Sequence, residues 1–76
     1  GRSIYMTWSG DDNAVKYTVT KEFGSKKQSF TGIFETNYHD MDTVPGVEYK
    51  YNIIAIDKYG IASKPSDSIL MTIPKD

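Results

Sequence analysis

Hydrophobic and polar residues alternate along most of this chain, as expected for β-strands that bury one face. The longest alternating run spans residues 47–57 and is rich in the β-formers Val, Tyr and Ile. Its inward positions are expected at Tyr49, Tyr51, Ile53 and Ala55. Pro45 and Gly46 before the run favour a chain reversal, and Gly60 marks a second turn after it. The pattern therefore predicts one long strand between two turns.

Five shorter segments are also predicted as strands. They are expected as strands at residues 4–9, 15–23, 26–34, 36–41 and 69–73. The 26–34 segment fits no single period, and Gly32 suggests a bulge or bend in an edge strand. Pro65 cannot donate to a sheet ladder, so pairing is expected to resume only beyond it, with Ile69, Met71 and Ile73 facing inward. No window has a helical period, so the chain is predicted to be an all-β antiparallel sandwich.

Three segments in order resemble the fibronectin type III domain. They are Ile4-x-Met6-x-Trp8, Tyr17-x-Val19, and the run from Tyr38-x-Asp40 through Pro45-Gly46 to Tyr49-x-Tyr51-x-Ile53-x-Ala55-x-Asp57-x-x-Gly60. The last run looks most like modules of bacterial secreted and carbohydrate-active proteins. The resemblance implies an immunoglobulin-like β-sandwich over residues 4–74, with strands B, C, C′, E, F and G. Strand A of the family, which should lie before Ile4, is missing.

The resemblance also implies roles for particular residues. Its structural signature consists of Trp8, Tyr17, Pro45, Gly46, Tyr49, Tyr51 and Gly60. Tyr49 should be the tyrosine-corner residue, whose hydroxyl bonds back to the chain before the turn. Trp8 should pack between the sheets against Tyr17 and Ile53, and the termini are expected at opposite ends. Residues 1–3 are interpreted as a cloning remnant, and residues 75–76 as the start of a linker.

Composition excludes several classes of function. The 76 residues carry a net charge of -1 and include a single arginine, Arg2, so a phosphate-binding surface for nucleic acid is not expected. The absence of cysteine excludes disulfides and thiolate metal sites. No apolar run approaches the roughly 20 residues of a spanning helix, so membrane insertion is not expected. No cofactor is expected either.

Two groups of polar residues contain side chains that could bind a metal or transfer a proton. His39 lies beside Asp40 and Asp42, but it should face solvent, and no second histidine or cysteine completes a zinc set. The run Asp11-Asp12-Asn13 offers oxygen ligands but lacks the spacing of a calcium loop, so turn capping is the preferred interpretation. The chain also has no nucleophilic serine elbow and no glycine-rich phosphate loop. We therefore expect no metal site, no catalytic residue and no enzyme activity.

The outward side of the long strand is a candidate interaction surface, because apolar residues are expected there. If Tyr49, Tyr51 and Ile53 face the core, then Ile54 and Ile56 face outward, where Leu70 should join them. With Tyr59, these residues are the predicted interaction surface. Sugar stacking on exposed aromatic rings is an alternative, with candidates at Tyr5, Phe23 and Tyr59.

The resemblance thus implies a non-catalytic spacer or interaction module of a larger multidomain protein. That protein is expected to be bacterial, and extracellular or at the cell surface. The partners would be neighbouring domains of the same polypeptide. The alternative is a binding module that recognises a protein or a polysaccharide through its loops or through the outer face of the C, F and G sheet.

Overall fold

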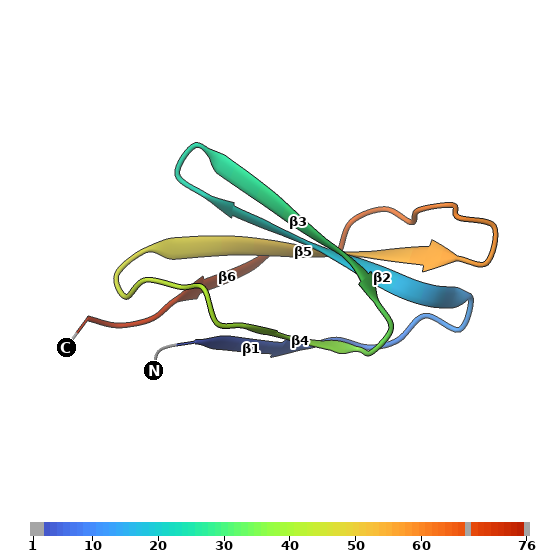
Figure 1. Cartoon of the computed structure of the whole chain (residues 1–76), viewed down its shortest axis with the longest axis horizontal. Coiled ribbons are helices and arrows are strands. Elements are labelled where there is room, and N and C mark those ends of the chain that lie inside the picture. The colour runs from blue at the N-terminus through green and yellow to red at the C-terminus, as the bar shows by residue number, and fades with distance from the viewer. Residues whose placement is uncertain (1–2, 67, 76) are drawn as a thin grey trace.

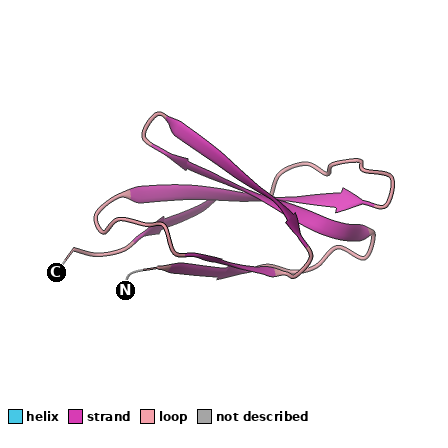
Figure 2. Ribbon diagram, viewed as in Figure 1, coloured by secondary structure: helices cyan, strands magenta, loops and turns pink. Residues whose placement is uncertain are grey.

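All regular structure in the described residues, 3–66 and 68–75, is β-strand in this computed structural model (Figure 2). The strands are β1 (Ile4–Thr7), β2 (Ala14–Phe23), β3 (Lys26–Ile33), β4 (Asn37–Asp40), β5 (Glu48–Asp57) and β6 (Ile69–Thr72). The all-β prediction is confirmed. Residues 1–2 of the expected cloning remnant and Asp76 of the expected linker lie outside the described residues.

The strands form two antiparallel sheets that face each other (Figure 1). One sheet contains β1 and β4, and the other has the strand order β3-β2-β5-β6. The long strand β5 is central in the larger sheet, with Tyr17 of β2 opposite Ala55 on one side and Met71 of β6 opposite Tyr49 on the other. Within the described residues, β1 has a strand partner on one edge only.

The alternation seen in the sequence produces the core between the sheets. The buried apolar side chains are Ile4, Met6, Tyr17, Val19, Tyr49, Tyr51 and Ile53. Ala55 is half-buried at the end of the inward row of β5. Met71 was expected to face inward, yet it is 38% exposed. We attribute this exposure to the narrower sheet, because two strands cover only part of a four-stranded face.

The β2–β3 hairpin is more regular than its sequence suggested. β3 pairs with β2 along its length, and the register shifts once, between Tyr17 and Val19. Gly32, on the strand opposite that shift, has a φ of 70°. This backbone angle is open to glycine at little steric cost, so the predicted irregularity at Gly32 is confirmed.

The regular β5–β6 ladder begins at Ile69, beyond Pro65 as predicted, but isolated pairing with β5 begins before the proline, at Ala62 and Ser63. The N–H groups of Ser63 and Ser66 donate to the carbonyl oxygens of Ala55 and Ile53, both at 2.8 Å. In return, the Oγ atoms of Ser63 and Ser66 accept bonds from Ala55 N–H at 3.0 Å and from Ile53 N–H at 2.8 Å. The two hydroxyls stand in for carbonyl acceptors, so the edge of β5 stays paired on both sides of Pro65.

The expectation that the termini lie at opposite ends is also wrong. β1 begins with Ile4 opposite Asp40, and β6 ends with Thr72 opposite Glu48. The turn at residues 41–47 connects these two places, so both termini lie at the same end of the molecule (Figure 1). We call this the corner-turn end. The opposite end, formed by residues 8–13 and 57–66, is called the loop end.

The glycines of the corner turn and of the β5 turn should be similarly sensitive to substitution. Gly46 and Gly60 both have positive φ, 86° and 81°, so an added Cβ should cost about 1–2 kcal/mol of unfolding free energy at either site. At Gly46 the new Cβ would meet only the flexible side chain of Lys75, which can move aside, and nothing lies within 4 Å at Gly60. Urea unfolding of Gly46→Ala and Gly60→Ala should therefore show similar losses. No loss at either site would contradict the backbone strain, and a clearly larger loss for Gly46→Ala would show that Lys75 is held in place on this turn.

Candidate functional site

Within the described residues, buried charged and polar side chains cluster between the two sheets. Lys21 of β2, Asp40 of β4 and Tyr51 of β5 are 1%, 2% and 0% exposed. Lys21 is brought there by the period of its strand, because it follows Tyr17 and Val19 on the inward face. A lysine and an aspartate therefore meet inside the core, where charged side chains are rare unless paired.

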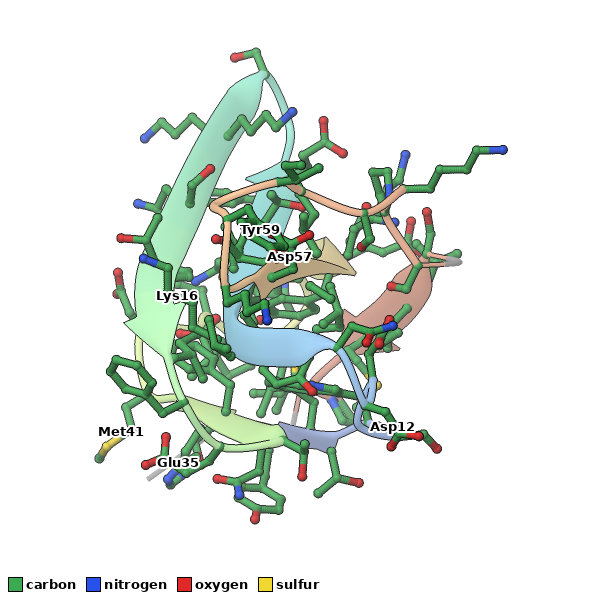
Figure 3. All side chains as sticks on the ribbon, turned by 90° about the vertical axis from the view of Figure 1, so that its right-hand side faces the viewer. Asp12, Lys16, Glu35, Met41, Asp57 and Tyr59 are labelled. Atoms are coloured by element: carbon green, nitrogen blue, oxygen red, sulfur yellow. The ribbon has the colours of Figure 1, made fainter. Side chains whose placement is uncertain are left out.

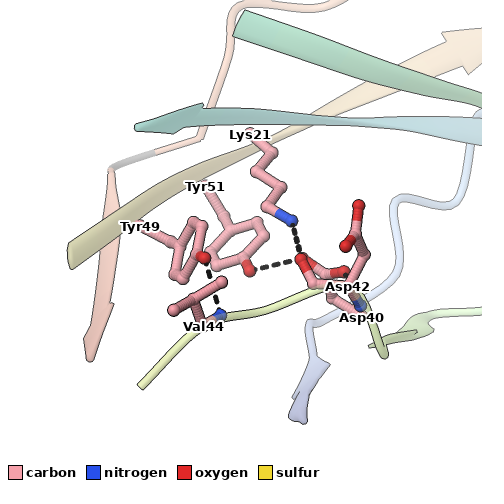
Figure 4. Close-up of polar contacts among 6 residues, drawn as sticks. All are labelled: Lys21, Asp40, Asp42, Val44, Tyr49 and Tyr51. Atoms are coloured by element: carbon pink, nitrogen blue, oxygen red, sulfur yellow. Dashed lines mark hydrogen bonds and ion pairs between the residues drawn. The ribbon is translucent and has the colours of Figure 1, made fainter. Parts of the chain in front are cut away.

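The three side chains form one hydrogen-bonded cluster, which we call the inter-sheet network (Figure 4). Lys21 Nζ lies 2.8 Å from Asp40 Oδ2, and Tyr51 Oη donates to the same oxygen at 2.6 Å. The other carboxylate oxygen accepts the N–H of Asp42 at 3.0 Å. Lys21 Nζ also donates to the carbonyl oxygen of Asp42 at 2.6 Å. Both oxygens of the buried carboxylate are thus occupied.

Aromatic rings surround the ammonium group on its other side. Lys21 Nζ lies 4.7 Å from the ring centroid of Tyr49 and 5.3 Å from that of Phe23. At these distances the ring faces attract a cation. The lysine is therefore compensated by a carboxylate, a carbonyl and two rings, and this environment accounts for its burial in the charged form.

The network shifts the pKa values of its members in opposite directions. Burial alone would raise the pKa of Asp40, but hydrogen bonds from Lys21, Tyr51 and Asp42 N–H, together with the charge of Lys21, outweigh it and lower that pKa. Burial raises the pKa of Tyr51, and its bond to the Asp40 carboxylate raises it further. The pKa of Tyr38 is also raised, by burial and then by the charge of Asp40. Asp40 therefore stays ionised and the tyrosines stay neutral.

The turn after β4 is tied to the larger sheet at a second point. Val44 N–H donates to Tyr49 Oη at 2.8 Å (Figure 4). This is the bond that the resemblance implied for a tyrosine corner. Together with the inter-sheet network, it attaches residues 40–44 to the inward face of the larger sheet.

Trp8 lies at the loop end, in contact with the core but not sealed within it. Its ring meets Tyr17 edge-on, with centroids 5.6 Å apart. The indole N–H is buried and finds no hydrogen-bond acceptor among the described residues. A cleft of about 290 Å³ opens beside Trp8, Tyr17, Ile53 and Ser63. The tryptophan thus packs on Tyr17, as the resemblance implied, but at the margin of the sandwich.

The residues of the predicted interaction surface do not form a single patch. Ile54 and Ile56 are half-buried neighbours on the outer face of β5. Leu70 is 59% exposed and lies opposite Lys50, so Asn52 separates it from Ile54 along the face. Tyr59 is 76% exposed in the turn after β5, where Lys58 Nζ lies 5.2 Å from its ring centroid. That this surface binds a partner stays a prediction.

A groove of about 480 Å³ lies beside Tyr59 at the loop end. It is lined by Asp12, Asn13, Ala14, Val15, Asp57, Lys58 and Tyr59. Figure 3 looks onto this end and shows Tyr59 next to Asp57, with Asp12 on the neighbouring loop. One oxygen of Asp57 is already used by the N–H groups of Tyr59 and Ile61, both at 2.9 Å. An aromatic ring and polar side chains therefore border one concave surface.

The other polar candidates have ordinary structural partners. His39 Nε2 lies 2.7 Å from Ser3 Oγ on the outer face of the smaller sheet, and its ring meets Tyr5 edge-on. Asp11 Oδ1 accepts the N–H of Asn13 at 2.8 Å, as in a capped turn. In residues 3–66 and 68–75, no three histidine, cysteine or acidic side chains are grouped to hold a metal ion. The same residues contain no helix with the length and hydropathy to cross a membrane.

Sequence reasoning missed Lys21, the residue that completes the inter-sheet network. The signal was available, since Tyr17, Val19 and Lys21 share one period. A lysine that continues an apolar face predicts a buried partner, and Asp40 two residues after Tyr38 was the acid on another inward face. The pattern alone does not show that these two positions meet, because that depends on how the sheets stack.

Comparison with solved structures found a likeness to a protein of related fold. The crystal structure of a Fn3-like protein from Clostridium thermocellum matches with a TM-score of 0.80 and 26% sequence identity. The match covers 96% of this chain and 78% of that chain. No family model matches the sequence, and no curated protein does. The likeness spans nearly the whole chain, so it includes both sheets.

Removing the buried carboxylate charge should destabilise the domain severely. In Asp40→Asn the Lys21 ammonium keeps its place in the core without a counter-ion, which should cost about 3–5 kcal/mol of unfolding free energy. A domain of this size has a total of about 4–11 kcal/mol. Lys50→Met is the matched control, because Lys50 and Glu22 form an exposed pair at 3.6 Å that should contribute under about 1 kcal/mol. Urea unfolding measures both, and similar losses would contradict a special role for the network.

Stability should fall on acidification because of Asp40. Its pKa is lower in the folded than in the unfolded state, so the folded state binds this proton less tightly. The stability it contributes should be complete above about pH 4, near the unfolded pKa, and should disappear as the pH falls through the folded value. Urea midpoints between pH 7 and pH 2 should follow this course. Asp40→Asn should show a flatter profile than the unsubstituted chain, and parallel profiles would assign the acid sensitivity to other carboxylates.

Proposed function

We propose that this chain, a fibronectin type III-like domain, is a non-catalytic spacer and interaction module of a larger extracellular bacterial protein. The family resemblance predicted from the sequence is confirmed by the likeness to the clostridial Fn3-like protein. In the family's lettering, β1 to β6 are strands B, C, C′, E, F and G. The multidomain and extracellular setting is the one that the sequence resemblance implies for such modules.

One observation carries the proposal. The two charged residues that are buried in the described part of the chain, Lys21 and Asp40, are 1% and 2% exposed and are bonded to each other. Charged groups of an active site must reach a substrate, whereas these join two sheets. Their charges and hydrogen bonds therefore hold the two sheets together, which supports a structural role for the domain. Because both chain ends lie at the corner-turn end, the domain would set the orientation of its neighbours there rather than separate them by its 44 Å length.

A binding screen of the isolated domain tests this proposal. A spacer should bind neither plant nor bacterial cell-wall glycans, and it should not bind the other domains of its polypeptide when they are supplied as separate molecules. Glycan arrays and calorimetry at 100 µM domain should show no saturable binding. Saturable binding of a glycan, or turnover of a glycoside by this chain alone, would overturn the spacer role.

A binding module is the second candidate, and the groove beside Tyr59 favours it. Tyr59 is 76% exposed, and the groove continues to Val15 and Asp12. Sugar rings stack on such aromatic faces, and carboxylates and amides accept their hydroxyl groups. The outer face near Ile54 and Ile56 adjoins this end of β5 and would serve a protein partner.

A single substitution separates this candidate from the spacer role. If the screen finds a ligand that uses the groove, Tyr59→Ala should weaken its binding about tenfold or more, equivalent to about 1.4 kcal/mol. Tyr5→Ala is the control, because Tyr5 is 59% exposed on the other sheet. Equal effects of the two substitutions on calorimetric affinity would rule out the groove as the site.

A further inference from the structure

We propose that β6 is a self-association edge, along which two copies of this chain pair as antiparallel strands. The two-fold axis of the pair passes beside Met71, so that Met71 faces its copy and Leu70 lies opposite Thr72 of the second copy. This inference goes beyond the proposed function and does not depend on it.

The β5–β6 ladder uses alternate residues of β6. Ile53 of β5 directs its backbone groups toward this side, because its N–H donates to Ser66 Oγ and its carbonyl oxygen accepts Ser66 N–H, both at 2.8 Å. Backbone groups alternate in direction along an antiparallel strand, so the residues two and four places before Ile53 point the same way. These residues lie opposite Ile69 and Met71. The backbone of Ile69 and Met71 is therefore bonded to β5.

The other residues of β6 point their backbone groups away from β5. Leu70 and Thr72 alternate with Ile69 and Met71, so their N–H and C=O groups lie on the far edge of the strand. β6 is the last strand of the larger sheet and pairs with β5 alone in the part of the chain that the structure describes. Its far edge therefore offers backbone donors and acceptors on which another strand can pair.

Apolar side chains are exposed on both faces of β6. Leu70 is 59% exposed on the outer face, and Met71 is 38% exposed on the inner face. Adjacent residues of a strand point to opposite faces, so a partner docked on one face covers only one of them. A strand paired with the edge covers both, because its own side chains also alternate between the faces. The exposure of both residues thus favours an occupant that extends the sheet.

Two other edge strands show what protects an edge. β3 begins with Lys26 and Lys27, and lysines on an edge oppose pairing with another chain. The inward side chains of β1, Ile4 and Met6, are 2% and 6% exposed, so pairing there would bury little more of them. β6 lacks both kinds of protection, since residues 68–74 carry no charge.

A second copy fits this edge. Antiparallel pairing about an axis beside Met71 places Leu70 of each copy opposite Thr72 of the other, and each such pair exchanges both of its backbone hydrogen bonds. The two Met71 side chains then lie side by side on the inner face. The uncharged segment brings no like charges together, and because each copy offers one such edge the assembly closes as a dimer.

The size of the interface determines its strength. β6 has only four residues, so pairing two copies buries less than the roughly 1,200–2,000 Å² of stable complexes between separate proteins. We therefore expect a weak dimer, with a dissociation constant of about 0.1–1 mM.

Sedimentation equilibrium of the 76-residue chain tests the pairing. From about 20 µM to about 2 mM, the average mass should rise from that of one chain toward that of two. Met71→Lys should stay monomeric because like charges would then lie opposite each other, whereas the control Ile61→Lys, at a residue 64% exposed at the loop end, should associate normally. A constant monomer mass, or equal association of the two variants, would overturn the proposal. So would a mass that rises beyond the dimer, because that requires a second edge.

A mixture of two variants tests the position of the axis. Met71→Lys and Met71→Glu should each be monomeric alone, whereas an equal mixture should form a dimer, because opposite charges then face each other. Recovery in the mixture would also show that neither variant had lost its fold. A mixture that stays monomeric would overturn the pairing at Met71.

Hydrogen exchange gives a readout without any substitution. The N–H groups of Leu70 and Thr72 should exchange at least about twofold more slowly at 2 mM than at 20 µM, whereas those of Ile69 and Met71, bonded within the chain, should not change. Equal exchange of Leu70 and Thr72 at both concentrations would overturn the proposal. It would leave the spacer role intact, because that role fails only if the isolated domain binds a ligand or turns one over.

Discussion

The fold depends on one buried ion pair, Lys21 with Asp40, which links the two sheets. Each sheet is held together by its own backbone hydrogen bonds, but the contact between sheets relies on side chains. Charges in a core usually cost stability unless their hydrogen bonds are complete. Here Tyr51, the N–H and carbonyl of Asp42, and two aromatic rings complete them. A chain of 76 residues without cysteine thus uses a polar link where other small domains use a disulfide.

The same link fixes the geometry of the turn that follows. Asp40 ends β4, and the tyrosine-corner bond from Val44 N–H to Tyr49 comes four residues later. Gly46 in turn holds the outgoing chain through Ile73. A short series of contacts therefore connects the buried ion pair to the segment that follows β6. A module whose exit is fixed in this way can impose an orientation on the domain joined to it, which is the physical content of the spacer proposal.

Much of the fold was predictable because it follows from local pattern. The period of two identified five of the six strands, all except β3, and the Pro45-Gly46 pair located the corner turn. Two details differ where local rules meet tertiary structure. The β5–β6 ladder begins beyond Pro65 as predicted, yet Ser63 already pairs with β5 before the proline, because its hydroxyl replaces a backbone acceptor. The termini lie at one end because β1 runs antiparallel to β4, whereas opposite ends were expected. The partner of Lys21 depends on sheet stacking, which no local pattern encodes.

The central claim is that Lys21 and Asp40 stabilise the domain by acting together across the sheets. A double-mutant cycle with Lys21→Met and Asp40→Leu, followed by urea unfolding at pH 7, tests it most directly. The account predicts that the double variant is at least about 2 kcal/mol more stable than the sum of the single losses implies, because each single variant leaves an unpaired buried charge. Losses that add to within about 0.5 kcal/mol would show that the two residues act independently, and would contradict the account.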